Sequence, residues 1–137
     1  MHEVVVGALV RGGRVLLAHR RPDKRAFPGV WDLPGGLVEG SEPELEALAR
    51  ELHEELGVRI ETGAASPLCR VVVRATDEPA LLSAWLVPAW RGTAVNVAPE
   101  EHDGLGWFGA TELPAFAHAL VRSSVLDALD ARGEHRG

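Results

Sequence analysis

The sequence is short of cysteine and tyrosine and has no long apolar run, and each shortage excludes something. One of the 137 residues is cysteine and none is tyrosine. The single Cys69 rules out an intrachain disulfide, which fits a reducing cytosol. No apolar run approaches the length of a membrane span, and no basic region precedes an apolar stretch at the N-terminus, as in a secretory signal. We therefore expect a cytoplasmic protein without a membrane partner.

Basic residues are fewer than acidic residues in this sequence. The chain has 14 Lys and Arg against 20 Asp and Glu, a formal net charge of -6, and no basic stripe is visible, so we expect no nucleic-acid partner. An acidic protein that binds a polyphosphate must neutralise that charge locally, which a divalent metal ion can do. With 46% hydrophobic and 25% charged residues, residues 1–137 have the composition and length of one globular domain. Residues 132–137 are expected to form a frayed tail.

Hydrophobic patterning predicts strands on both sides of two helices. A hairpin turn is expected at residues 11–14, and Pro34-Gly35-Gly36 should interrupt the third strand. Because strands come before, between and after the helices, the fold class is mixed α/β, with helices covering a mixed sheet. The expected strands are residues 4–10, 15–20, 31–38, 58–62, 68–76, 80–90 and 107–108; the expected loops are 21–30 and 92–105; the second helix is 115–131.

The most regular segment is the first helix, predicted over residues 42–56. Ser41 has the character of an N-cap and Glu44 stands three residues later, which together predict a capping box. Gly57 is a natural stop just after the helix. Leucines recur at helical spacing and predict the stripe that faces the core. They are Leu45, Leu48, Leu52 and Leu56.

One side of this helix is unusually acidic. At about 100° of rotation per residue, Glu44, Glu51 and Glu55 fall beside the leucine stripe, with Glu54 next to them. The like charges of Glu51 and Glu55, at i and i+4, cost about 0.2–0.5 kcal/mol, and the helix has a single arginine, Arg50, to offset them. A solvated acidic face is one interpretation. The other is a site for a hard divalent cation, which prefers oxygen ligands, and the neighbouring Pro-Gly-Gly segment favours it because glycine allows close approach.

The segment that carries these acids resembles a known family. Residues 36–58 read GLVEGSEPELEALARELHEELGV, which resembles the complete Nudix box, G-x5-E-x7-R-E-U-x-E-E-x-G-U with U a bulky aliphatic residue. WDLPGG (31–36) and EHDGLGWF (101–108) resemble the family's flanking segments, so the resemblance spans about residues 3–130. It implies the Nudix fold, an α/β/α sandwich. The fixed positions are filled by Gly36, Glu42, Arg50, Glu51, Leu52, Glu54, Glu55, Gly57 and Val58.

The resemblance implies a metal-dependent hydrolase of the MutT type that uses Mg²⁺, with Mn²⁺ as a substitute. Glu51 or Glu101 would be the general base, since family members differ on this point, and Glu100 is the alternative to Glu101 in the distal loop. Arg50 would hold a glutamate in place through a charge-assisted hydrogen bond. The implied metal ligands are the carbonyl of Gly35 and the carboxylates of Glu51, Glu54, Glu55 and Glu101.

Further residues are assigned supporting or substrate-binding roles. Glu42 would support the metal ligands, and Gly57 would have a structural role at the helix end. Gly36 would let the substrate approach the backbone closely. Arg21 matches in position an arginine that contacts substrate in MutT-type members, although it could equally be a solubilising strand end. Trp31 could stack on a base, or it could equally have a core or lid role.

Subfamily marks narrow the substrate by elimination. Ala117 and His118 stand where MutT enzymes that prefer oxidised guanine carry an asparagine, and the tyrosine of dinucleoside-polyphosphate hydrolases is absent. Members that hydrolyse ADP-ribose often carry a proline at a set distance past the box. Pro67 is too close to the box and Pro79 too far from it to match that proline. We therefore expect a nucleotide substrate, a (deoxy)nucleoside triphosphate cleaved to NMP and pyrophosphate. The alternatives are an ADP-ribose or nucleotide-sugar pyrophosphatase and a non-catalytic ligand-binding module. Family members are commonly homodimers.

Overall fold

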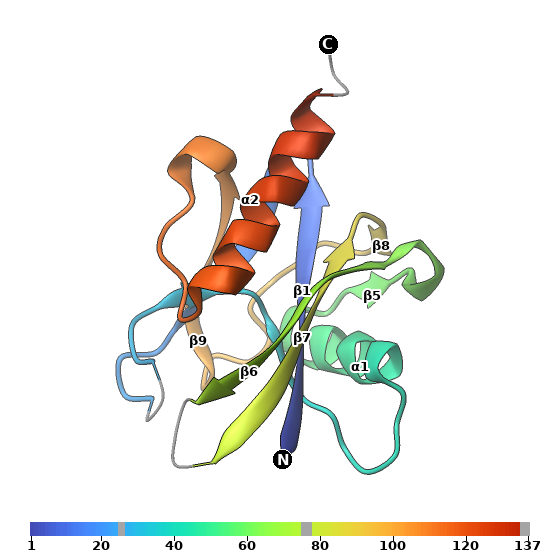
Figure 1. Cartoon of the computed structure of the whole chain (residues 1–137), viewed down its shortest axis with the longest axis vertical. Helices are drawn as coiled ribbons and strands as arrows, with labels where there is room; N and C mark the ends of the chain where they lie inside the picture. The colour runs from blue at the N-terminus through green and yellow to red at the C-terminus, as the bar shows by residue number, and fades with distance from the viewer. Residues whose placement is uncertain (25–26, 75–77, 135–137) are drawn as a thin grey trace.

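A mixed sheet with one helix on each side makes up the computed structural model, which describes residues 1–24, 27–74 and 78–134 (Figure 1). The helices are α1 (Glu44–Leu56) and α2 (Ala119–Glu134), and short 3-10 turns occupy Thr62–Ala64 and Ala110–Glu112. The strands are β1 (His2–Arg11), β2 (Arg14–Arg20), β3 (Trp31–Asp32), β4 (Gly35–Leu37), β5 (Arg59–Ile60), β6 (Ser66–Arg74), β7 (Pro79–Val87), β8 (Trp90–Arg91) and β9 (His102–Gly109).

Strand β1 organises the sheet, whose order is β3-β2-β1-β7-β6. It runs parallel to β7 along most of its length, while its other edge changes partner. The first half of β1 pairs with β4, where Val6 lies opposite Gly35, and its end pairs with β2, where Val10 lies opposite Val15. Strand β9 continues the sheet beyond β2. The sheet therefore splits between β4 and β2, and the clefts described below open at that split.

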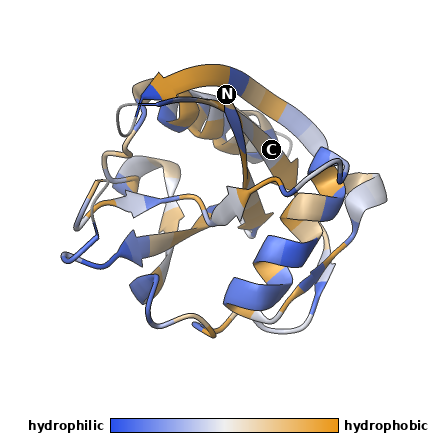
Figure 2. Cartoon of the chain, turned by 90° about the horizontal axis from the view of Figure 1, so that it is seen from below, coloured by the Kyte–Doolittle hydropathy of each residue, from blue (hydrophilic) through white to orange (hydrophobic). Residues whose placement is uncertain are grey.

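The two faces of β1 feed two separate cores because side chains alternate along a strand. Val6, Ala8 and Val10 face a core that includes three residues of α2, whereas Val5 and Leu9 face α1. The leucine stripe of α1 is confirmed: Leu48, Leu52 and Leu56 are fully buried and Leu45 is partly buried. Hydrophobic residues dominate the central strands, while the loops and outer helix turns carry the hydrophilic ones (Figure 2). None of the helices in the described ranges is long and apolar enough to cross a membrane.

The predicted start of the first helix is wrong, whereas its end is confirmed. Pro43 stands at the N-cap without a side-chain cap, and the helix begins at Glu44, so the capping box of Ser41 and Glu44 does not form. The Glu44 carboxylate instead accepts hydrogen bonds from Trp85 Nε1 and from Arg70 Nη2, the latter at 2.7 Å. Tertiary partners thus outcompete the local cap. Gly57 ends the helix in the left-handed region at φ 74°, as predicted.

Several strand boundaries also differ from the prediction. Gly35 and Gly36 form β4 rather than interrupt a strand, and the break falls at Leu33-Pro34. The predicted strand 58–62 is limited to β5. The predicted loop 92–105 is wrong from residue 102 onward. The predicted strand 107–108 is confirmed but is longer than expected, because β9 pairs along the whole of β2. Glycines at alternate positions of β9 weaken its local strand signal, and the long-range pairing supplies what the local sequence lacks.

The C-terminal helix is shifted relative to the prediction for 115–131. It begins at Ala119, because the preceding carbonyls of Leu113 and Pro114 each accept a hydrogen bond from the Arg122 guanidinium at 2.8 Å rather than starting a helix. It continues through Glu134, so the expected tail at 132–137 is wrong for its first half, and residues 135–137 lie outside the described residues. The predicted antiparallel pair of 68–76 and 80–90 is confirmed as β6 and β7, but β7 ends at Val87 and Trp90 belongs to β8; residues 75–77 lie outside the described residues.

Candidate active site

A carboxylate-lined cleft of about 430 Å³ lies between α1, β4 and the loop that precedes β9. The acids come from segments far apart in the sequence, and the fold brings together all five predicted metal ligands. Glu100, the predicted alternative to Glu101, also lines the cleft. The lining residues are Gly35, Gly36, Leu37, Glu39, Glu51, Glu54, Glu55, Val97, Ala98, Glu100 and Glu101.

Two glycines allow β4 to lie against both β1 and α1. A Cβ atom on Gly35 would lie 2.0 Å from the carbonyl oxygen of Val5. Gly35 also has a φ of 154°, which residues other than glycine rarely adopt. A Cβ atom on Gly36 would lie 2.5 Å from the carboxyl carbon of Glu51. The Gly-Gly pair therefore sets the distance between the backbone of β4 and the acids of α1.

Arg50 ties the glutamates of this helix to the preceding loop. Its Nη2 donates to Glu42 Oε1 at 2.7 Å and to the carbonyl of Leu37 at 3.1 Å, and its Nη1 donates to Glu51 Oε1 at 3.0 Å. The hydrogen bonds with Glu42 raise the pKa of Arg50, and the same bonds lower the pKa of Glu42. Charge-assisted bonds of this kind hold side chains in one orientation. Arg50 therefore links Glu42, the Leu37 carbonyl and Glu51.

Glu55 is the most buried acid of the cleft, with 7% of its surface exposed. Burial, followed by a hydrogen bond with Glu51 and that residue's charge, raises the pKa of Glu55 to about 9. Its Oε1 has no hydrogen-bond partner, and the nearest basic group, Nε2 of His102, lies 3.6 Å away. Burial also lowers the pKa of His102, which disfavours an imidazolium partner. An unsatisfied buried carboxylate oxygen beside a second carboxylate is a donor set that suits a hard divalent cation.

The acids share the cleft without meeting at one point. Within the described ranges, no three His, Cys, Asp or Glu side chains are grouped closely enough to hold a metal ion, so Glu51, Glu54 and Glu55, which are predicted to bind the same cation, do not converge on one point. Neighbouring cations explain the spread. Glu54 is 58% exposed and lies 3.5 Å from Arg50 Nη1, and Glu101 pairs with Lys24 at 3.0 Å.

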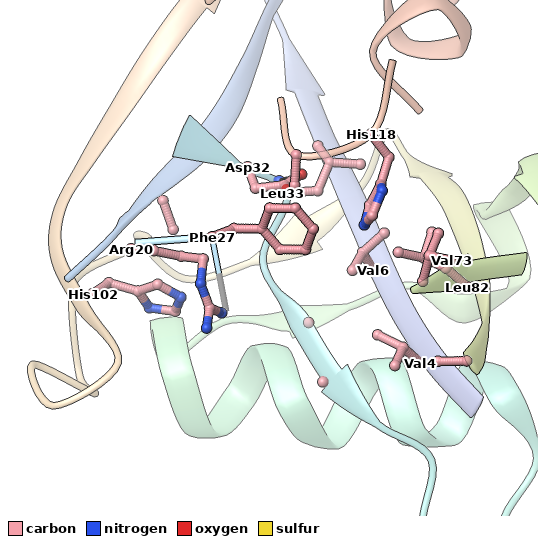
Figure 3. Close-up of a pocket in the computed structure, with 15 residues that line it drawn as sticks. Val4, Val6, Arg20, Phe27, Asp32, Leu33, Val73, Leu82, His102 and His118 are labelled. Carbon is pink, nitrogen blue, oxygen red and sulfur yellow. Dashed lines mark hydrogen bonds between the residues drawn. The ribbon is translucent and has the colours of Figure 1, made fainter. Parts of the chain in front are cut away.

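A second pocket, of about 240 Å³, adjoins the acidic cleft and shares Gly35 and Gly36 with it. Figure 3 shows Phe27, Asp32 and His118 on one side of it and Arg20 and His102 on the other. The ring of Phe27 packs edge-on against that of His118, with centroids 5.0 Å apart. Burial raises the pKa of Asp32, although the N–H of Leu33 donates to its Oδ1 at 2.8 Å. The remaining walls are mostly apolar: Val4, Val6, Ala18, Leu33, Val73, Ala80, Leu82 and Ala117.

The predicted substrate-binding side chains lie elsewhere. Arg21 pairs with Asp23 and donates to the carbonyl of Pro99 at 3.4 Å, and it lines neither cleft. Trp31 packs against the rings of His19 and Phe108, with centroids 4.9 and 5.1 Å away. Sequence reasoning missed the pocket residues Phe27 and Asp32. The WDLPGG segment was the available signal, since Asp32 stands within it.

Comparisons with known proteins match most of the chain to one family. The family model described as NUDIX domain matches residues 1–129. The chain is 36% identical to the CTP pyrophosphohydrolase of Escherichia coli K12, over 96% of this chain and 93% of that protein. It is 42% identical to a putative 8-oxo-dGTP diphosphatase 2 of Mycobacterium tuberculosis H37Rv, over 80% and 74% of the two chains. It also resembles the crystal structure of a MutT NUDIX hydrolase from Burkholderia pseudomallei, with a TM-score of 0.80, 35% identity and coverage of 92% and 95%.

Proposed function

The chain belongs to the Nudix family of hydrolases, and on that premise we propose that it cleaves a (deoxy)nucleoside triphosphate to NMP and pyrophosphate with Mg²⁺. One observation carries the proposal. The acidic cleft and the largely apolar pocket share Gly35 and Gly36, so an elongated ligand can place its charged end in one and its ring end in the other. A nucleotide has this shape and polarity.

The triphosphate is favoured over ADP-ribose by the relatives that the chain matches. Besides the CTP pyrophosphohydrolase and the putative 8-oxo-dGTP diphosphatase 2, the chain is 42% identical to a nucleoside triphosphatase NudI of an Enterobacter strain, over 47% of this chain and 45% of that protein. Cytoplasmic location, a homodimer and a single domain over residues 1–137 belong to the same proposal, on the grounds of the family resemblance.

The cation site is assigned to Glu51, Glu54, Glu55, Glu101 and the carbonyl of Gly35, with Mn²⁺ able to replace Mg²⁺. When bound, divalent cations neutralise the anhydride oxygens and make water a better nucleophile. Arg50 keeps the Glu51 carboxylate directed at the cleft. Glu51 or Glu101 accepts the proton of the attacking water, since both carboxylates face the cleft.

The adjoining pocket is assigned to the nucleoside. Its apolar walls exclude water from the ring, and Phe27 offers an aromatic edge. Asp32 and His118 are the polar groups placed to hydrogen-bond the ring edge. Their contacts would set the choice of base, because an unpaired buried polar group is costly.

The test is a substrate panel with Mg²⁺ and with a chelator, with the products identified. Pyrophosphate and NMP are expected from triphosphates, and Glu54→Gln should lower kcat/KM by at least about tenfold, the usual effect of weakening a metal site. Glu46→Gln is the matched control, because Glu46 lies exposed on the same helix outside the cleft. Sugar phosphate as the main product, or turnover insensitive to chelator, would overturn the proposal. Nucleotide binding without turnover would favour the non-catalytic alternative.

A further inference from the structure

Lys24 extends from the loop after β2 to the rim of the acidic cleft. Its Nζ lies 3.0 Å from Oε2 of Glu101, and the lysine side chain is 25% exposed. Backbone contacts fix this approach. The N–H of Lys24 donates to the carbonyl of Arg21 at 3.1 Å, and the N–H of Arg21 donates to the carbonyl of Glu101 at 3.4 Å. The backbone of residues 21–24 thus positions the Lys24 ammonium group against Glu101.

Lys24 differs from the other cation of the cleft in how firmly it is held. Among the described residues, the ion-pair partners of the cleft's glutamates are Arg50, Lys24 and His102. Arg50 is fixed by bonds to Glu42, Glu51 and a backbone carbonyl. The Lys24 ammonium stands at the end of a flexible stem, and within the part of the chain that the structure describes it has one carboxylate partner, Glu101, which is 46% exposed. A partly exposed pair of this kind is weak and can be exchanged.

Glu101 is also one of the carboxylates that the proposed function assigns to the cation. An ammonium group and a divalent cation cannot both lie against the same carboxylate oxygen at contact distance without strong repulsion. Displaced from Glu101, the ammonium would remain at the rim, where a polyphosphate is the nearest anion that a substrate would supply. A compact point charge on a long stem suits such a transfer.

We propose that Lys24 is an exchangeable counter-ion, which holds Glu101 until substrate and cation bind and then transfers its ammonium group to a phosphate oxygen. The inference rests on the proposed function. Lys24 therefore weakens cation binding to the protein alone and strengthens nucleotide binding. It makes the cleft accept a cation together with a polyphosphate more readily than a cation by itself.

The experiment measures Mn²⁺ affinity of the full chain by electron paramagnetic resonance, without nucleotide. Lys24→Met should bind Mn²⁺ about two- to fivefold more tightly than wild type, the range expected for loss of one partly exposed competing ion pair. Lys24→Arg should stay near wild type. Arg14→Met, which removes an equal charge at the far end of β2, should change nothing. In a Glu101→Gln background, Lys24→Met should no longer tighten Mn²⁺ binding.

Steady-state kinetics provide the second measurement. Lys24→Met should raise the KM for the nucleoside triphosphate several-fold, with kcat changed by less than about threefold, because the ammonium contributes to binding in both ground and transition states. Equal Mn²⁺ affinity of wild type and Lys24→Met, or an unchanged KM, would overturn the inference while leaving the proposed function intact. A wild-type protein that binds no Mn²⁺ with or without nucleotide would overturn both.

Discussion

Replacement of Gly36 by alanine tests whether the position of the Glu51 carboxylate decides activity. The new Cβ would lie 2.5 Å from the Glu51 carboxyl carbon, whereas ordinary contact begins at 3.4 Å, so the carboxylate must retreat by about 0.9 Å. The retreat would also stretch the 3.0 Å hydrogen bond from Arg50. Gly36 does not have a positive φ, so alanine meets no backbone strain there.

The displacement sets the expected magnitude. A misplacement of about 1 Å in a catalytic arrangement can cost about 100-fold in rate, which corresponds to about 2.7 kcal/mol. Stability should change by less than about 1 kcal/mol, because the obstacle is the end of a flexible side chain. Gly35→Ala should behave differently. Its Cβ would meet the backbone oxygen of Val5 at 2.0 Å with φ at 154°, so it should destabilise the fold by at least about 3 kcal/mol.

Three quantities are measured for each variant. They are kcat/KM in the presence of Mg²⁺, the affinity for Mn²⁺, and the thermal unfolding temperature in the presence of a chelator. Gly63→Ala is the matched control, since a Cβ there meets nothing within 4 Å. Gly36→Ala should keep the melting temperature and lose activity, whereas Gly35→Ala should lose the fold. Gly36→Ala activity within threefold of wild type would refute the argument that this carboxylate must stay in place. A stability loss as large as that of Gly35→Ala would show that the collision is with the backbone.

Two further predictions concern stability. Leu52→Ala removes a fully buried side chain from the core between α1 and β1 and should lower the free energy of unfolding by about 3 kcal/mol in urea titration; a loss under about 1 kcal/mol would contradict the packing. Burial raises the pKa of Asp32 above its ordinary 3.8, so the folded state favours the protonated carboxyl group. The stability that this protonation gives is fully present below pH 3.8. It is lost as the pH rises through the folded-state pKa of Asp32. Asp32→Asn should therefore gain stability relative to wild type across that pH window, and a difference independent of pH would count against a raised pKa.

The first helix could be predicted because its signals are local. Residues three and four apart lie on one helix face, so the leucine stripe, the acidic side and the stop at Gly57 follow from spacing alone. The predicted capping box at the start of this helix is wrong because the contact that replaces it is not local. Glu44 and Ser41 have the residue types of a capping box, but Trp85 and Arg70, far along the chain, take the Glu44 carboxylate.

The sequence by itself determined the acidic helix, its glycine-rich approach and the Arg50 that holds its glutamates, because these lie within one continuous segment. Only the tertiary structure placed Asp32 in the pocket that adjoins the acidic cleft, paired β9 with β2 and brought the Lys24 ammonium to the Glu101 carboxylate. Such contacts join residues distant in the chain. They depend on how strands distant in the chain pair and where the sheet splits, and local spacing in the sequence carries no signal for either.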